Sequence, residues 1–482
     1  MSLSLSRFAA LGLAAVVACG DDDPDTPPVS TDPNDLTLLR QVLDTNADIA
    51  FAAYSDSVSA AEAMKAAVET FLMGPSPQTF ANAKAAWLAA REPYGQTEVY
   101  RFRASPIDDT NYDVSDGEDG PEGDINAWPL GEALIDYVVQ GTDFGEAEVG
   151  VTAHQTGVAD PIGQNTIINS TSITIDADLL ANTATAEDEH DVIAGYHAIE
   201  FLLWGQDLNA DGSADTVTTR DMTAGQRPHT DFIQGAGCTS GPTAETDGTL
   251  CTRRATYLRV AIDKLIADLT SVRDAWAAGA SYRTAFTTVA DLEEGKGRLL
   301  EILTGMGTLS EGELGGERMQ ISLSANSQED EHSCFSDNTH RDIWLNAEGV
   351  QNSYRGEYAG YDSTGDGTDD MVARAVSGYG WDDYLKDVGF ETLAGEIETA
   401  LATTAAGYQA IDAAARQGMT VDRVIIDASS EAARPMRDTI IALNAQATQI
   451  ARIATELGLG DASDVVDPDA SECDTSDPTS SC

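Results

Sequence analysis

The segment DVIAGYHAIEFLLWGQD, residues 191–207, predicts a helix that is apolar on almost every side. At about 100° per residue, one face of this helix carries Val192, Tyr196, Ile199 and Leu203. His197 and Glu200 lie together on another face, so the helix is expected to be central and to bury a charged group. A buried carboxylate is costly unless it is paired, hydrogen-bonded or bound to a metal.

His197 and Glu200 are three positions apart, which places both side chains on the same surface of the helix. From there both can coordinate one metal ion. The alternative is a His–Glu hydrogen bond inside a helical bundle, with no metal. The chain has no H-E-x-x-H motif, so the usual helix-borne geometry of zinc proteases is absent.

A second polar set occurs in WLAAREPYGQTEVYRF, residues 87–102. Arg91, Tyr94 and Glu98 share one face of a predicted helix, provided that the helix continues through Pro93. Glu98 is then either a further metal ligand, supported by Arg91 and Tyr94, or the partner of Arg91 in an internal salt bridge. Two inward carboxylates and one histidine favour iron or zinc over copper.

A third set lies in EDEHSCFSDNTHRDIWLNAEGVQNSY, residues 329–354. Asp337 or Asn338 can cap a helix, and His340 follows on the apolar stripe of that helix. His332 and Cys334 come just before it. We expect His340 and Asp337 to present polar groups towards the first set; the alternative for His340 is a lone histidine in the core.

Two loops have the spacing of the first nine positions of a calcium-binding loop. DLNADGSAD places oxygen donors at Asp207, Asn209, Asp211, Ser213 and Asp215. DSTGDGTDD repeats the spacing at Asp362, Thr364, Asp366, Thr368 and Asp370. Neither loop has the bidentate glutamate at position twelve, so acidic turns without calcium are the alternative.

Apolar residues recur at threes and fours through most of the chain, which predicts an all-α protein. The predicted helices span about 47–72, 80–102, 254–276, 285–305, 339–356, 382–416 and 427–457. Only NTIINSTSITID, residues 165–176, alternates like a short hairpin. We expect two helical-bundle domains, at 38–237 and 252–459, from an ancient duplication and with the site at their interface.

The two ends of the chain predict export and attachment. Residues 1–19 resemble a lipoprotein signal peptide, with Arg7, a short apolar run and the lipobox-like VVAC that ends at Cys19, the predicted lipidated residue. Residues 20–37 predict a disordered acidic linker and residues 460–482 a disordered acidic tail. The membrane is then contacted through the lipid anchor alone.

Charge and cysteine content narrow the functional classes. With 27 Lys and Arg against 81 Asp and Glu, the net charge of −54 excludes a nucleic-acid binder, which needs positive surface. Export permits disulfides. Cys238 and Cys251 share a Gly- and Thr-rich loop that favours a local disulfide, and Cys473 and Cys482 can pair in the tail. Cys334 is then either free or exchanged into another of these pairings.

The sequence GYHAIEFLLWGQDLN resembles the G-x-H-x-x-E signature of the imelysin family, in its iron-regulated protein A branch. Blocks similar to that family follow in its order: AWLAAREPYGQTEVYRF, GDINAWPLGEALIDYV, RPHTDF, CTRRATYL and HSCFSDNTHRDI. The resemblance implies two related helical bundles with a site around His197 and Glu200. The resemblance also implies a bacterial envelope lipoprotein connected with iron uptake. The family is in addition labelled as a family of metallopeptidases.

Three functions remain open at this point. The first is a lipid-anchored binding protein that captures iron, or a small iron-bearing ligand, and passes it to an iron-transport partner in the envelope. The second is a zinc-dependent metallopeptidase in which His197 and Glu200 hold zinc and a carboxylate such as Glu200 or Glu98 activates water. The third is an interaction module without a metal.

Overall fold

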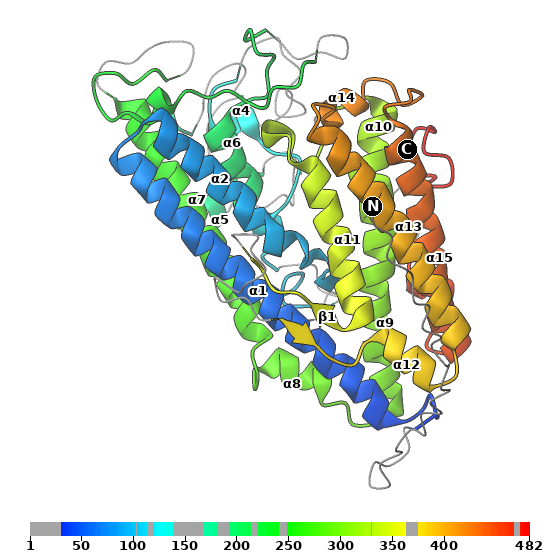
Figure 1. Ribbon diagram of the computed structural model, residues 1–482. Coiled ribbons are helices and arrows are strands. Elements are labelled where there is room, and N and C mark those ends of the chain that lie inside the picture. Colours follow the sequence, from blue (N-terminus) through cyan, green and yellow to red (C-terminus); the bar gives the residue numbers. More distant parts are fainter. Residues whose placement is uncertain are drawn as a thin grey trace, which may run out of the picture.

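The computed structural model is almost entirely helical, as the apolar periodicity predicts (Figure 1). It describes residues 30–102, 104–112, 120–138, 167–181, 192–213, 220–240, 248–328, 330–362, 375–466 and 473–482. Within these ranges the only sheet pairs two short antiparallel strands, β1 (Glu357–Tyr358) and β2 (Val376–Ser377). The predicted all-α fold class is therefore confirmed.

One group of helices forms around the long helix α1 (Leu36–Met73), which crosses the molecule diagonally in Figure 1. Against it pack α2 (Pro77–Gly95) and α7 (Thr249–Ala275), and α6 (Gly195–Trp204) lies between α2 and α7. Local capping fixes where these helices begin: the Asp35 side chain accepts from the Thr37 N–H, and Ser76 and Thr79 form a capping box. The predicted domain boundary at residues 238–251 assigns α7 to the second bundle, whereas α7 contacts α1 and α6.

A second group of helices forms around α15 (Arg434–Leu457). Its neighbours are α9 (Leu292–Thr308), the wide π-helical segment η6 (Leu309–Ile321) and α13 (Glu391–Ala415). Helix α11 (Thr339–Arg355) packs on α13 and η6 and turns its other side to α2, so that it joins the two groups (Figure 1).

Short elements connect these helices. They are η1 (Glu98–Tyr100), α3 (Glu122–Ile125), α4 (Glu132–Ile135), α5 (Ala177–Ala181), η5 (His229–Phe232), α8 (Ser281–Thr287), α10 (Ser322–Ala325), η7 (Cys334–Ser336), α12 (Trp381–Asp387), α14 (Val421–Val424) and η8 (Ala462–Asp464).

Polar contacts hold α2 against α11. The Arg341 guanidinium binds the Glu92 carboxylate through two hydrogen bonds of 2.9 and 2.7 Å, and the Asn346 amide donates to the Gly95 carbonyl at 2.8 Å. Gly349 permits this close approach, because a Cβ there would lie 2.5 Å from the Gln96 carbonyl oxygen. The two groups of helices therefore meet along a polar, closely packed seam.

The segments RPHTDF (227–232) and CTRRATYL (251–258) each supply an arginine to a buried ion-pair network. Arg254 donates to both oxygens of Asp136 at 2.6 and 2.9 Å, and Arg227 lies 2.7 Å from the same carboxylate. Although burial raises the pKa of Asp136, the charges of Arg227 and Arg254 lower it by more, to well below its usual value. This network ties α7 to the segment around α4.

The structure corrects several predicted element boundaries. Two predicted helices are each broken in two: Asp291 caps a new helix at α9, and Gly389, at φ +90°, separates α12 from α13. The predicted helix over 80–102 ends at Gly95, after Pro93, and α15 starts at Arg434 rather than near residue 427. The predicted hairpin is wrong over its described residues 167–176, which form turns.

The predicted disulfides are both present, Cys238–Cys251 and Cys473–Cys482, and Cys334 is buried outside them. The tail residues 473–482 lie on η6, where the Gln320 amide donates to the carbonyls of Asp474, Asp477 and Ser480. No helix within the described residues combines the length and apolarity needed to cross a bilayer. The predicted lipidation residue Cys19 lies outside the described residues.

We expect the double substitution Cys238→Ser and Cys251→Ser to lower the free energy of unfolding by about 3 kcal/mol, because the disulfide restricts the unfolded chain. Thermal unfolding followed by circular dichroism measures the change. The control, Cys473→Ser with Cys482→Ser, opens a loop at the chain end and is expected to leave the main transition nearly unchanged. An unchanged melting temperature in the first variant would contradict the structural role of the Cys238–Cys251 bond.

Candidate functional site

Helix α6 begins at the glycine of the G-x-H-x-x-E signature. Gly195 has φ +79°, a conformation that favours glycine, and a Cβ there would lie 2.4 Å from the Ile125 carbonyl oxygen. Every residue of α6 is buried. The Trp87 indole donates to the Tyr196 carbonyl at 3.0 Å and the Tyr257 hydroxyl donates to the Ile193 carbonyl at 2.7 Å. Helix α6 is thus the buried central helix that its composition predicts.

His197 and Glu200 form a buried pair on α6. Both side chains are 0% exposed, and His197 Nδ1 lies 3.0 Å from Glu200 Oε2. The other carboxylate oxygen, Oε1, accepts from the Ser336 main-chain N–H at 2.9 Å and from its hydroxyl at 2.6 Å. Both oxygens of Glu200 are therefore engaged, one by the histidine and one by the segment that precedes α11.

Burial sets the protonation of this pair. It raises the pKa of Glu200 well above its usual value, although the Ser336 hydrogen bonds oppose the shift. Burial and the neighbouring His332 lower the pKa of His197 well below its usual value. The His197 ring is therefore neutral at physiological pH.

The second ring nitrogen of His197 is the unusual atom of the site. Its Nε2 is buried and has no hydrogen-bond partner within the part of the chain that the structure describes. Two rings surround His197, that of Trp128 at 4.9 Å and that of His332 at 4.6 Å between centroids. Buried polar atoms in native proteins are nearly always paired, so this nitrogen points to a ligand.

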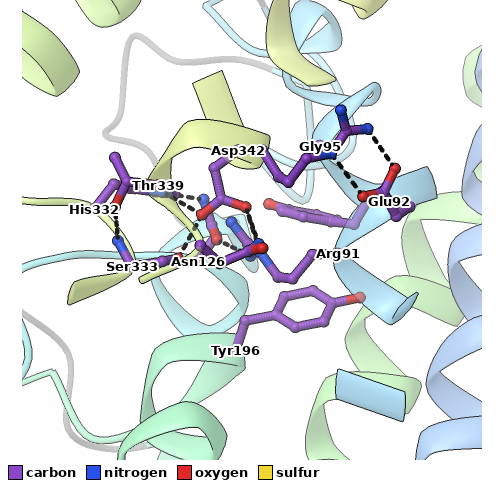
Figure 2. Close-up of polar contacts among 12 residues, drawn as sticks. Arg91, Glu92, Gly95, Asn126, Tyr196, His332, Ser333, Thr339 and Asp342 are labelled. Carbon is purple, nitrogen blue, oxygen red and sulfur yellow. Dashed lines mark hydrogen bonds and ion pairs between the residues drawn. The ribbon is translucent and has the colours of Figure 1, made fainter. Parts of the chain in front are cut away.

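His332 belongs to a second carboxylate–histidine pair, shown with its surroundings in Figure 2. Its Nδ1 lies 2.9 Å from Asp342 Oδ2. The other oxygen, Asp342 Oδ1, accepts from Arg91 Nε at 3.1 Å, and the Ser333 hydroxyl donates to Oδ2. In Figure 2 the Tyr196 ring lies beneath the Arg91 guanidinium, whose central carbon is 4.8 Å from the ring centroid.

The pKa of the carboxyl group in this second pair is shifted in the opposite direction to that of Glu200. Burial raises the pKa of Asp342, but Arg91 and His332 lower it by more, so that it lies well below its usual value and the carboxylate stays ionised. Burial and the Arg318 charge lower the pKa of His332. His332 is therefore a neutral imidazole, held by an ionised carboxylate.

A cavity of about 290 Å³ opens beside His332, in the seam between the two groups of helices. Carboxylates outnumber guanidinium groups in its wall, and the two rings next to His197, those of Trp128 and His332, both line it. The lining residues are Arg101, Glu122, Asn126, Ala127, Trp128, Pro129, Glu313, Glu317, Arg318, Ile321, Asp330 and His332. Several of them lie on η6, and π-helical insertions often occur at functional sites.

Glu98 is inward-facing, as predicted, but it lies on η1 rather than on the helix of Arg91 and Tyr94. The predicted Arg91–Glu98 salt bridge is wrong: Arg91 pairs with Asp342, and Glu98 pairs with Arg318 at 2.9 Å and Arg101 at 3.2 Å. Burial raises the pKa of Glu98, but these two arginines bring it down to about 2.

His340 and Asp337 line a different hollow from the one beside His332. His340 Nδ1 donates to the Asp337 carbonyl at 3.0 Å, and its Nε2 lies 3.5 Å from Asp412. The Asp337 carboxylate instead lies close to those of Asp207 and Asp422. The two predicted residues of the second bundle are thus neighbours of the site rather than part of the His197 environment.

The structure describes one predicted calcium loop in part. Asn209 Oδ1 accepts from the Asp221 N–H at 3.0 Å and Asp211 Oδ1 from the Ser213 N–H at 2.9 Å, while Asp207 accepts from the Gln328 amide. The remaining ligand of this loop, Asp215, lies outside the described residues. The second loop is described only at Asp362; the predicted ligands beyond it are also outside, namely Thr364, Asp366, Thr368 and Asp370.

Four residues of the site have no role in the prediction from sequence: His332, Asp342, Asn126 and Ser336. One signal was available for Asp342: with Thr339 and Asn346 it repeats at helical spacing, which puts three polar residues on a face that packs inward. A buried polar stripe requires partners. The partners themselves come from segments far away in the chain, so no local pattern identifies them.

We expect Asp342→Asn to lower the free energy of unfolding by about 3–5 kcal/mol, because it leaves Arg91 buried without its counter-charge. The substitution also changes how the free energy of unfolding depends on pH. The folded pKa lies below the unfolded value of 3.8, so the stability from Asp342 is complete above about pH 4 and lost as the pH falls through the folded pKa. Urea unfolding from pH 2 to 7 is the measurement.

The matched control is Asp438→Asn, whose carboxylate is 65% exposed on α15. It should change neither the urea midpoint nor its pH slope appreciably. If Asp342→Asn unfolds at the same urea concentration as the unaltered protein, the Arg91–Asp342 pair does not hold the two helices together.

Comparison with known proteins identifies a family and a fold. The Imelysin family model, Peptidase_M75, matches residues 50–453. A solved structure described as an iron-regulated protein A precursor, from Parabacteroides distasonis ATCC 8503, has a TM-score of 0.52 and 17% identity over 90% of this chain and 96% of that one. An imelysin-like protein from Psychrobacter arcticum 273-4 has a TM-score of 0.48 and 14% identity over 90% of this chain and 100% of that one. The search of curated proteins gives no match.

The family match includes α2, α6 and α11, the helices that carry Arg91, His197 with Glu200, and Asp342. The Parabacteroides structure shares the helical fold along almost its whole length. The resemblance of GYHAIEFLLWGQDLN to the imelysin signature is confirmed. The chain belongs to the imelysin family.

Proposed function

We propose that the protein binds a metal ion, with iron as the physiological cargo, between its two groups of helices. The observation that carries this proposal is His197 Nε2, a fully buried imidazole nitrogen with no hydrogen-bond partner among the described residues. A hydrogen bond between His197 and Glu200 accounts for only one of the two ring nitrogens. A cation supplies the missing partner of the other nitrogen.

The arrangement of two histidines supports a metal rather than a neutral ligand. His197 and His332 lie with their rings 4.6 Å apart, and each has Nδ1 against a carboxylate, that of Glu200 or of Asp342. Metal-binding histidines typically donate their other N–H to a carboxylate, which fixes the ring and makes the free nitrogen a better donor. Because burial keeps both imidazoles neutral, neither has to lose a proton before binding.

Iron fits the donors at hand. Imidazole suits iron and zinc, and carboxylate oxygens such as those in the adjoining cavity suit harder ions, so a mixed set favours iron over copper. The cavity of about 290 Å³ has room for a hydrated ion or a small iron-bearing ligand. The description of the Parabacteroides structure as an iron-regulated protein A precursor is consistent with iron as the cargo.

A zinc peptidase is the alternative that the family label suggests. Such an enzyme needs a carboxylate that can take a proton from a metal-bound water. Glu200 already accepts from His197 and Ser336, and Glu98 is held by Arg318 and Arg101. Neither predicted carboxylate is therefore available as a base in this geometry, which favours binding over catalysis.

Attachment to the cell envelope completes the proposal. The signal-like residues 1–19 with Cys19 provide export and a lipid anchor, and the net charge of −54 attracts cations to the exposed body. A protein held at the membrane that takes up iron reversibly would deliver it to an iron-transport partner in the envelope. The calcium that the sequence spacing predicts for the two Asp-rich loops is no part of this proposal.

We expect His197→Ala to weaken iron binding by at least about tenfold, since it removes a ligand that the fold positions. Binding of Fe²⁺ under anaerobic conditions, measured by calorimetry, tests this, with circular dichroism to verify folding. The matched control is His340→Ala. His340 is a partly buried histidine whose Nε2 faces Asp412 and not the proposed metal site. Equal loss of affinity in both variants, or in neither, would contradict the proposed site.

Glu200→Gln tests the role of the carboxylate without changing the volume of the side chain. Gln can still accept from Ser336, but its NH₂ group then donates to His197 Nδ1, which moves the ring proton to Nε2 and blocks the metal ligand. We expect iron affinity to fall by about 10- to 100-fold with helical content unchanged. Zinc-dependent cleavage of an unfolded peptide that Glu200→Gln abolishes would support the peptidase instead.

A further inference from the structure

Three aspartates from separate parts of the chain converge next to the 334–337 turn. Asp207 follows α6, Asp337 lies between η7 and α11, and Asp422 lies on α14. One carboxylate oxygen from each lies within 4.8 Å of the others. Asp207 is 7% exposed and Asp422 only 2%, so this aspartate cluster (Asp207, Asp337 and Asp422) is largely shielded from water.

A fourth carboxylate lies beside the cluster. Glu331 is fully buried, and its Oε1 accepts from the Thr339 hydroxyl at 2.8 Å. Its other oxygen, Oε2, has no hydrogen-bond partner in the described residues, and the same holds for Asp422 Oδ1. An unpaired buried carboxylate oxygen is costly, and two of them beside a cluster of like charges indicate a missing cation.

The charges around the cluster do not balance. The Glu331 carboxyl group lies close enough to Asp422 and Asp337 for the charges of both to act on it. The guanidinium groups whose charges act on Asp422 are those of Arg220 and Arg423. Four carboxyl groups thus lie near two guanidinium groups, and a divalent cation would balance this excess of acidic groups.

The near arginines are directed to other acceptors. Arg220 donates to the Asn326 side chain at 3.0 Å and to the Asp422 main-chain carbonyl at 3.4 Å. Arg423 donates to the Gly418 carbonyl at 3.5 Å. The charges of these two arginines reduce the repulsion around Asp422.

We propose that Asp207, Asp337 and Asp422, with Glu331 beside them, form a calcium site that is distinct from the histidine site. All the donors are carboxylate oxygens, which suit hard cations, and no histidine nitrogen or thiolate belongs to the set. Calcium takes six to eight oxygen ligands in flexible geometry, as carboxylates from three separate segments can provide. Magnesium demands a smaller and more regular octahedron.

This site differs from the calcium loop that the sequence spacing predicts. In the loop, Asp207 would share its ion with Asn209 and Asp211. In the structure the Asp207 carboxylate faces Asp337 and Asp422, while Asn209 and Asp211 accept from main-chain N–H groups of their own loop. The two assignments share Asp207 and differ in every other ligand, so substitutions can separate them.

A cation here would also fix the turn that serves the histidine site. Ser336, which donates twice to Glu200, is adjacent in the chain to Asp337. Calcium bound by Asp337, Asp207 and Asp422 would join the end of α6, the start of α11 and α14. The calcium ion would therefore stabilise the contact between these segments beside His197, whatever ligand the histidines bind.

The test is calcium binding by the full-length protein after treatment with EGTA, measured by calorimetry together with the melting temperature. We expect one Ca²⁺ per chain and a higher melting temperature in its presence. Asp422→Asn should weaken binding by at least about tenfold, because affinity depends on the number of charged ligands. Asp337→Asn, at a partly exposed position, provides the same test if Asp422→Asn does not fold.

Two controls locate the ion. Asp427→Asn changes an exposed aspartate five residues beyond Asp422, and Asp211→Asn removes a ligand of the predicted loop; both should bind Ca²⁺ as the unaltered protein does. His197→Ala should also retain Ca²⁺ binding, which separates this site from the proposed iron site. Absence of Ca²⁺ binding in the folded protein, or loss with Asp211→Asn and retention with Asp422→Asn, would overturn the proposal.

Discussion

The buried ion pair between Arg91 and Asp342 is the contact on which the geometry of the site depends. It joins α2 to α11, and both side chains are at most 2% exposed. Removing two charges from water is costly, and the cost is offset here by further hydrogen bonds: Arg91 donates to Asn126 at 2.5 Å, and Asp342 accepts from His332, Ser333 and Asn338. The same carboxylate that holds the helices together thus also orients His332.

Because of this arrangement, neither group of helices contains a complete site. His197 and Glu200 come from α6, whereas His332 and Ser336 come from the segment that leads into α11. Glu200 has both oxygens satisfied only when that segment is in place. Under the proposed function, metal binding between the two groups would be linked to the packing of the groups against one another, because the ligands would come from distant segments.

Much of the fold follows from local patterns. Apolar periodicity predicts α1, α7, α11 and most of α15, and the apolar composition of α6 correctly predicts that its two polar residues are buried. Short-range signals explain the errors. The cap at Asp291 and the glycine at 389 break two predicted helices, and Pro93 near the end of α2 moves Glu98 onto a separate turn, where Arg318 becomes its partner.

The sequence by itself determined that the chain is helical, that α6 is buried and that His197 and Glu200 lie within it, because these properties depend on neighbours three or four residues away. Only the tertiary structure decided which groups meet them. His332 and Ser336 reach α6 from more than a hundred residues further along the chain, and Asp207 faces Asp337 and Asp422 instead of its own loop. Such pairings result from the packing of whole helices, and no spacing within one segment encodes them.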